Sequence, residues 1–90
     1  MKLPILDLDK CNKQEQLIKI QEEYEEFVWA DNFDEEILEG IDLIQAMMGY
    51  LMKIVPNNDD LQQYFEIHNE KLASRKWETD GHIELKFHYK

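Results

Sequence analysis

The sequence predicts an all-α fold, an antiparallel helical bundle that is completed by oligomerisation and followed by a short C-terminal β-strand. Three observations support this fold class. Apolar residues recur at helical spacing along three long stretches of the chain, each preceded by a residue type that caps helices. The middle stretch is apolar on two faces, which one thin partner helix cannot cover. The last residues instead alternate between apolar and polar types, as a strand does.

Length and composition place the chain among small globular proteins. Its 90 residues are 43% hydrophobic and 33% charged, and they predict a single domain over residues 1–90. The net charge of −10 argues against nucleic acid as a partner, because phosphate binding takes clusters of Lys and Arg. The single Cys11 excludes an internal disulfide and suits a reducing compartment. With no signal peptide and no apolar run of about 18 residues, we expect a soluble, cytoplasmic protein without a membrane partner.

A capping signal separates the N-terminal arm from the first helix. Residues 1–11 hold a short apolar run interrupted by Pro4, which predicts an extended arm or a short edge strand. Asn12 followed by Glu15 resembles a capping box, so we expect the first helix over about residues 13–30. The apolar stripe of this helix is Leu17, Ile20, Tyr24, Phe27 and Val28.

The second helix is unusually apolar. It is predicted over about residues 34–55, with a start signal at Asn32 and a stop at Pro56. The short connection before it predicts that the first two helices form an antiparallel pair. Gly49 in its interior costs roughly 1 kcal/mol against Ala, which a close helix approach would offset. Its two apolar stripes are Ile37, Ile41, Ile44, Met48, Leu51, Val55 and Leu43, Met47, Tyr50, Ile54. Burial on both sides predicts a central helix in an oligomeric bundle.

A third helix and a strand-like tail complete the chain. The loop at residues 56–60 contains the cap of a helix that we expect over about residues 59–75. After a turn signal at Asp80 and Gly81, residues 82–90 alternate strictly between apolar and polar types and predict one strand. This strand needs a partner, which would be either residues 3–8 or another subunit.

Acidic residues are concentrated in one segment of the chain. Residues 21–44 contain ten Asp and Glu and no Lys or Arg, which equals the whole net charge. Glu23 and Glu26 lie three apart in the first helix, and Glu39 and Asp42 lie three apart in the second. Residues three apart are neighbours on a helix surface, and packed helices lie about 8–10 Å apart, so the four carboxylates can converge. Asp42 supports this most, because its helix is largely apolar and Asp is rarely buried without a partner.

A set of carboxylate oxygens predicts a hard divalent cation. Mg²⁺ suits such ligands, with Mn²⁺ able to replace it, and four carboxylates suit two or three ions that enter with a polyphosphate. A di-iron site would require Glu-x-x-His, which the sequence lacks. The alternative, a solvated acidic helix face, stays open and is favoured for Glu22, Glu25, Asp34, Glu35 and Glu36.

Three segments carry a resemblance to a known family. Residues 22–26 (EEYEE) and 38–44 (LEGIDLI) place Glu-x-x-Glu on one helix and Glu-x-x-Asp on the next. Residues 68–77 (HNEKLASRKW) contain Asn-x-Lys-x-x-x-Arg downstream. In this order, over about residues 13–77, the chain resembles the MazG-type, or all-α, nucleoside triphosphate pyrophosphohydrolases. The tail at residues 82–90 is not part of the family motif.

The resemblance implies a reaction, a metal and an assembly. The reaction is Mg²⁺-dependent hydrolysis of an NTP or dNTP between its α and β phosphates, which gives a monophosphate and pyrophosphate. The family works as a homodimer or homotetramer, in accord with the doubly apolar second helix. The implied roles are Mg²⁺ binding for Glu23, Glu26, Glu39 and Asp42, phosphate binding for Lys71 and Arg75, and orientation of the attacking water for Glu22.

Two other classes of function fit the same sequence. An acidic interaction protein that mimics DNA would use the charge as a surface, which does not explain why Glu39 and Asp42 interrupt an apolar helix. A regulator without turnover would bind metal or nucleotide and release no product. The preferred base stays open, because the core is favoured over base stacking as the role of each aromatic residue able to stack: Trp29, Phe33, Tyr64 and Trp77.

Overall fold

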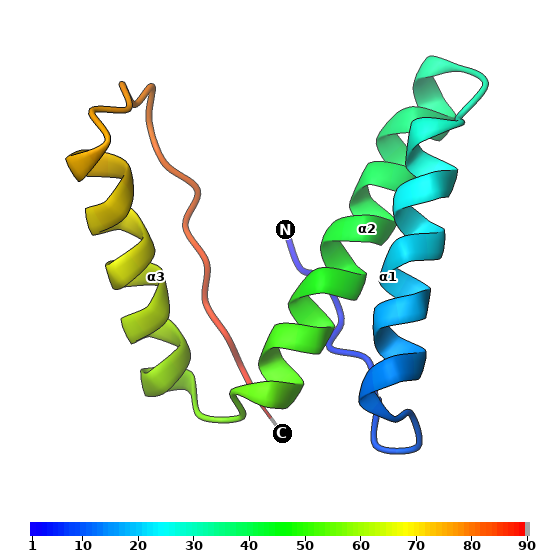
Figure 1. Cartoon of the computed structure of the whole chain (residues 1–90), viewed down its shortest axis with the longest axis horizontal. Coiled ribbons are helices and arrows are strands. Elements are labelled where there is room, and N and C mark those ends of the chain that lie inside the picture. The colour runs from blue at the N-terminus through cyan, green and yellow to red at the C-terminus, as the bar shows by residue number, and fades with distance from the viewer. Residues whose placement is uncertain (90) are drawn as a thin grey trace. The chain divides into compact units, whose positions relative to one another are not determined.

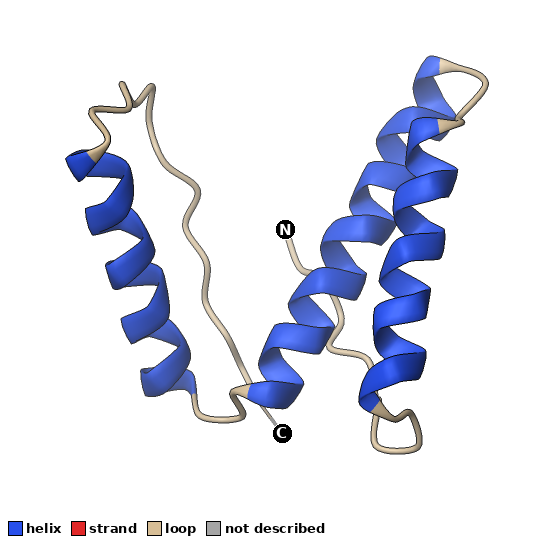
Figure 2. Cartoon of the chain, in the orientation of Figure 1, coloured by secondary structure: helices blue, strands red, loops and turns tan. Residues whose placement is uncertain are grey.

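The computed structural model describes residues 1–89, and its regular structure there is helical (Figures 1 and 2). The helices are α1 (Lys13–Val28), α2 (Phe33–Ile54) and α3 (Asn58–Ser74), which confirms the predicted all-α class. The chain divides into two compact units, Met1–Ile54 and a second unit from Val55 onward. The single domain expected over residues 1–90 stays a prediction. In the described range, no helix combines the length and the apolar character that crossing a membrane requires.

The first two helices begin at the caps that the sequence predicts. The Asn12 side chain accepts a hydrogen bond from the backbone N–H of Glu15 at 2.8 Å and donates one to the Glu15 carboxylate at 2.8 Å. Asn32 accepts from the backbone N–H of Glu35 at 2.9 Å in the same way. Each cap satisfies a backbone donor that has no partner within its helix. The expected ends are less accurate, since α1 ends at Val28 rather than Ala30.

Helices α1 and α2 lie side by side as an antiparallel pair (Figure 1). Phe27 of α1 packs against Gly40 of α2, where an added Cβ would lie 3.2 Å from the Phe27 ring. Gly49, which was expected to mark a close helix contact, is instead approached by the Leu8 side chain at 3.3 Å. Glycine therefore makes room for α1 at one position of α2 and for the N-terminal arm at the other.

The N-terminal arm has no regular secondary structure in residues 1–8 and turns at residues 9–10, and side chains of α2 hold it. Gln45 Nε2 donates to the Pro4 carbonyl at 2.9 Å. Lys53 Nζ donates to the carbonyls of Leu8 and Cys11, both at 2.6 Å. Because side chains rather than a strand bind these carbonyls, residues 1–11 form no edge strand.

In the second unit, α3 begins at Asn57, whose side chain accepts from the backbone N–H groups of Asp59 and Asp60. The helix ends in a Schellman motif. Lys76 has a φ of 59°, its N–H bonds to the Ala73 carbonyl, and the Trp77 N–H bonds to the Leu72 carbonyl.

The predicted C-terminal strand is not confirmed. Residues 82–89 form no strand, and Lys90 lies outside the described residues. This segment runs back beside α3 (Figure 1), where the Phe87 ring stacks on Phe65 with centroids 5.8 Å apart. The Tyr89 hydroxyl donates to the Val55 carbonyl at 3.1 Å. The alternating apolar side chains therefore pack on a helix, and the backbone lacks the neighbouring strand that a ladder requires.

Apolar burial is sparse in the described part of the chain. The buried hydrophobic residues are Met52 and Leu61, and no side chain is fully enclosed. Exposed apolar residues of α2 are Phe33, Ile37, Leu38, Ile41, Ile44, Met47 and Ile54, each between 40% and 74% exposed. The burial of α2 on two sides, which the sequence predicts, is thus not reached within the first unit.

Candidate metal centre

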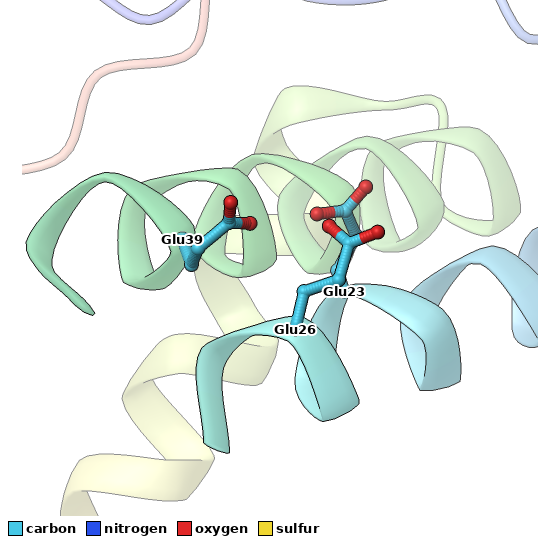
Figure 3. Close-up of side chains that lie close together, drawn as sticks. All are labelled: Glu23, Glu26 and Glu39. Carbon is cyan, nitrogen blue, oxygen red and sulfur yellow. The ribbon is translucent and has the colours of Figure 1, made fainter. Parts of the chain in front are cut away.

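Three acidic side chains from two helices meet in the first unit (Figure 3). Glu23 and Glu26 come from α1 and Glu39 from α2, and one carboxylate oxygen of each lies within 4.8 Å of the others. The spacing of three residues places Glu23 and Glu26 on one face of α1. The antiparallel packing of α1 and α2 then brings Glu39 to the same place. Three of the four carboxylates that were expected to converge therefore meet here.

Burial makes this cluster different from a solvated acidic face. Glu23 is only 7% exposed, Glu39 is half-buried and Glu26 is exposed. Within residues 1–89, the buried Oε2 atoms of Glu23 and Glu39 have no hydrogen-bond partner. A carboxylate oxygen removed from water without a partner costs free energy, so it needs a proton or a cation.

The acidic neighbours of Glu39 and its burial affect its pKa. Burial raises the pKa of the Glu39 carboxyl, and interaction with the neighbouring Glu26 carboxyl raises it further. The charges of Asp42 and Glu23 act in the same direction. The carboxyl of Glu39 therefore holds its proton more tightly than an isolated glutamate does.

A basic residue that the sequence analysis did not single out contacts the cluster. Lys19 Nζ lies 2.7 Å from Glu23 Oε1, with the two residues one turn apart on α1. Its hydrogen bond and its ion pair with Glu23 raise the pKa of Lys19, and the charges of Glu22 and Glu26 add to this. The spacing of four residues on a helix was the signal that could have identified it.

Asp42 lies next to the cluster rather than within the set of three. It is exposed on α2, one turn after Glu39, and it lines a groove that Glu23 also lines. This groove, of about 270 Å³, lies between the N-terminal arm, α1 and α2. Its apolar wall includes Leu6 and Leu8. Asp42 therefore stays a predicted fourth ligand, at the border between cluster and groove.

The other predicted site residues lie outside the cluster. Glu22 precedes Glu23 on α1 and is exposed. Lys71 and Arg75 belong to α3 and its C-cap in the second unit, and both are exposed. The Arg75 backbone N–H donates to the Lys71 carbonyl at 3.0 Å, as a helix end requires. Their roles toward water and phosphate stay predictions.

The chemistry of the cluster fits a hard divalent cation. All three groups are carboxylates, and two of them offer buried oxygens that have no partner among residues 1–89. Two oxygens on one Mg²⁺ lie at most about 4.2 Å apart, because each bond is about 2.1 Å long. Oxygens within 4.8 Å of one another therefore reach that range through side-chain rotation.

No protein-family model, curated protein or solved structure matches this chain.

Proposed function

We propose that the protein is a Mg²⁺-dependent nucleoside triphosphate pyrophosphohydrolase. It would cleave an NTP or dNTP between the α and β phosphates to give a monophosphate and pyrophosphate. One observation carries the proposal, the meeting of Glu23, Glu26 and Glu39 with two buried oxygens that have no partner in the described residues. The order of the acidic pairs and of Asn69, Lys71 and Arg75 supports this choice among reactions that use carboxylate-bound metal.

The proposed roles follow from the chemistry of each side chain. Glu23, Glu26 and Glu39, with Asp42 beside them, would hold the cation. When bound, Mg²⁺ neutralises charge on the triphosphate and lowers the pKa of a water molecule. Glu22 accepts a proton from the attacking water. The water oxygen forms a bond to the phosphorus that it attacks. The bond from that phosphorus to the oxygen that bridges the α and β phosphates breaks, and the bridging oxygen leaves with the other product.

The phosphate ligands and the order of binding also follow from charge. Lys71 and Arg75 donate hydrogen bonds to phosphate oxygens, Arg75 with the two-pronged geometry of a guanidinium. A cluster of carboxylates repels a triphosphate, so the cation would have to bind before the nucleotide or together with it. Nucleotide binding should therefore require the divalent cation.

The experiment is to incubate the protein with each NTP and dNTP in Mg²⁺ or Mn²⁺ and to identify the products. Asp42→Asn should abolish pyrophosphate release with the helical circular dichroism spectrum retained. Glu36→Gln, an exposed change on the same helix, should leave it intact. A nucleoside diphosphate with inorganic phosphate would contradict the bond assignment. No product from any nucleotide, with cation-dependent nucleotide binding, would favour a regulator without turnover.

We also propose that the protein works as a homodimer or homotetramer assembled on α2. Seven apolar side chains of α2 are exposed, among them Ile41 and Ile44. A contiguous apolar helix face of this kind is typical of protein interfaces, and a second α2 would cover it with the same residue types. Sedimentation equilibrium should give a mass of two or four times 10.9 kDa. A monomer at all concentrations would contradict this assembly.

A further inference from the structure

We infer that Lys19 is a substrate-positioning residue of this site, with an ammonium group that exchanges between Glu23 and the phosphate oxygens of the nucleotide. When a divalent cation is bound by Glu23, the ammonium group turns to the phosphates that arrive with the cation. This inference rests on the proposed function for the identity of the ligand. It assigns a phosphate-binding lysine to the first unit, and this lysine is not among the residues that carry the family resemblance.

The geometry of the ion pair allows the exchange. Lys19 Nζ lies 2.7 Å from Glu23 Oε1, and the Glu23 side chain is only 9% exposed. The Lys19 side chain is 61% exposed, so the surrounding protein leaves it room to change rotamer. A lysine stem has four flexible carbons and its ammonium group donates in several directions. Rotation about side-chain bonds is therefore enough to move the charge, without any change in α1.

Competition for Glu23 supplies the reason to move. Glu23 Oε1 is held by Lys19, and its buried Oε2 has no partner in the part of the chain that the structure describes. One oxygen of Glu23 also lies within 4.8 Å of oxygens of Glu26 and Glu39. A divalent cation in this cluster and the ammonium group on the same carboxylate would repel each other at short range. Cation binding therefore weakens the pair between Lys19 and Glu23.

The groove beside the cluster provides the place to move to. Lys19, Glu23 and Asp42 line it together, and Leu6 and Leu8 form part of its apolar wall. Among the described residues that line this groove, Lys19 is the one with a positive charge. A triphosphate held by a cation at Glu23 would bring its negative oxygens to the part of the groove that Lys19 and Glu23 line. An ammonium group at that position forms charge-assisted hydrogen bonds with them.

The first arm of the test uses the cation alone. Mn²⁺ affinity is measured by electron paramagnetic resonance or calorimetry for wild type, Lys19→Met and Lys13→Met. Lys13 begins the same helix and lies about 15 Å from Glu23 along the helix axis. At moderate salt the Debye length is about 10 Å, so the charge of Lys13 is largely screened from Glu23. Loss of a competing ion pair should tighten Mn²⁺ binding about three- to fivefold in Lys19→Met. Lys13→Met should change it by less than about 1.5-fold.

The second arm uses an α,β-methylene nucleoside triphosphate at saturating Mg²⁺. Lys19→Met should bind this analogue about tenfold or more weakly, as expected for loss of a charge-assisted hydrogen bond, and Lys19→Arg should restore most of the affinity. Lys13→Met should bind it as wild type does. Circular dichroism with a chelator checks that each variant keeps its helices.

The two arms separate the outcomes. Weaker Mn²⁺ binding by Lys19→Met would overturn the inference, because Lys19 would then hold Glu23 in place for the metal. Unchanged analogue affinity in Lys19→Met would overturn it as well. If wild type hydrolyses no nucleotide but both shifts appear, the proposed reaction fails and the role of Lys19 stands. If wild type binds no Mn²⁺, the metal centre and the inference fail together.

Discussion

The carboxylate cluster makes a quantitative prediction for Glu39→Gln, a change that removes one charge and keeps the size of the side chain. Glu39 is the contribution of α2 to the set of three oxygens within 4.8 Å, so the variant leaves ligands from α1 alone. A cation that binds the folded chain stabilises it by mass action. The stabilisation by Mg²⁺ or Mn²⁺ should therefore be large in wild type and small in Glu39→Gln.

The magnitude follows from linkage. At a cation concentration of 100 times the dissociation constant, binding stabilises the wild-type fold by about 2.7 kcal/mol. In a domain of this size, that corresponds to a rise in Tm of roughly 10–20 °C. Loss of a group that only orients a ligand weakens metal binding 10- to 100-fold, so loss of one of three direct ligands should cost about 100-fold. At the same cation concentration, the variant then keeps about one-seventh of the stabilisation free energy, which corresponds to a rise in Tm of roughly 2–3 °C.

The assay is thermal unfolding followed by circular dichroism, in chelator and in increasing Mg²⁺ or Mn²⁺. Glu36→Gln is the matched control, since it removes the same charge from an exposed position one turn earlier on α2. The control should gain as much from the cation as wild type does. An equal gain in Glu39→Gln would refute the reasoning, because the carboxylates would then not share a cation.

Three further predictions concern stability. With a chelator present, the free energy of unfolding should fall as pH rises above about 4.5, because folded Glu39 has a raised pKa and binds its proton more tightly than the unfolded chain does. Titration in urea should show this fall in wild type and a smaller one in Glu39→Gln; equal slopes would contradict it. Lys76→Gly should raise the free energy of unfolding by about 0.5–1 kcal/mol, because the φ of 59° strains a side chain but not glycine. A loss of stability in urea denaturation would show that Lys76 does more than end the helix. Lys53→Met should speed hydrogen exchange in residues 1–11 several-fold, since it removes the donors to Leu8 and Cys11. Lys13→Met is the control. If residues 1–11 exchange no faster in Lys53→Met than in this control, the packing of Leu8 against Gly49 holds the arm instead.

Helix starts and the acidic pair on α1 were predictable because their causes are local. Asn12, Asn32 and Asn57 each bond to a backbone N–H two or three residues later, so a short stretch of sequence contains both partners. Glu23 and Glu26 share a face of α1 through helical spacing alone. The same applies to Lys19 and Glu23, whose spacing was available in the sequence.

Partners distant in sequence decided the rest. Alternation in residues 82–90 indicated a strand, but Phe87 packs on Phe65 of α3 and no ladder forms in the described tail. Gly49 indicated a close helix contact, yet Leu8 of the arm approaches it, and Phe27 of α1 approaches Gly40 instead.

Local patterns in this chain thus determined where helices begin and which acids share a helix face. The packing of α1 against α2 decided that Glu39 joins Glu23 and Glu26, and the folding of the arm and the tail decided what covers Gly49 and Phe65. The physical reason is range. A cap or an i,i+3 pair is complete within one helical turn, whereas a ladder, a packed ring or a three-carboxylate site needs a partner that the fold alone brings near.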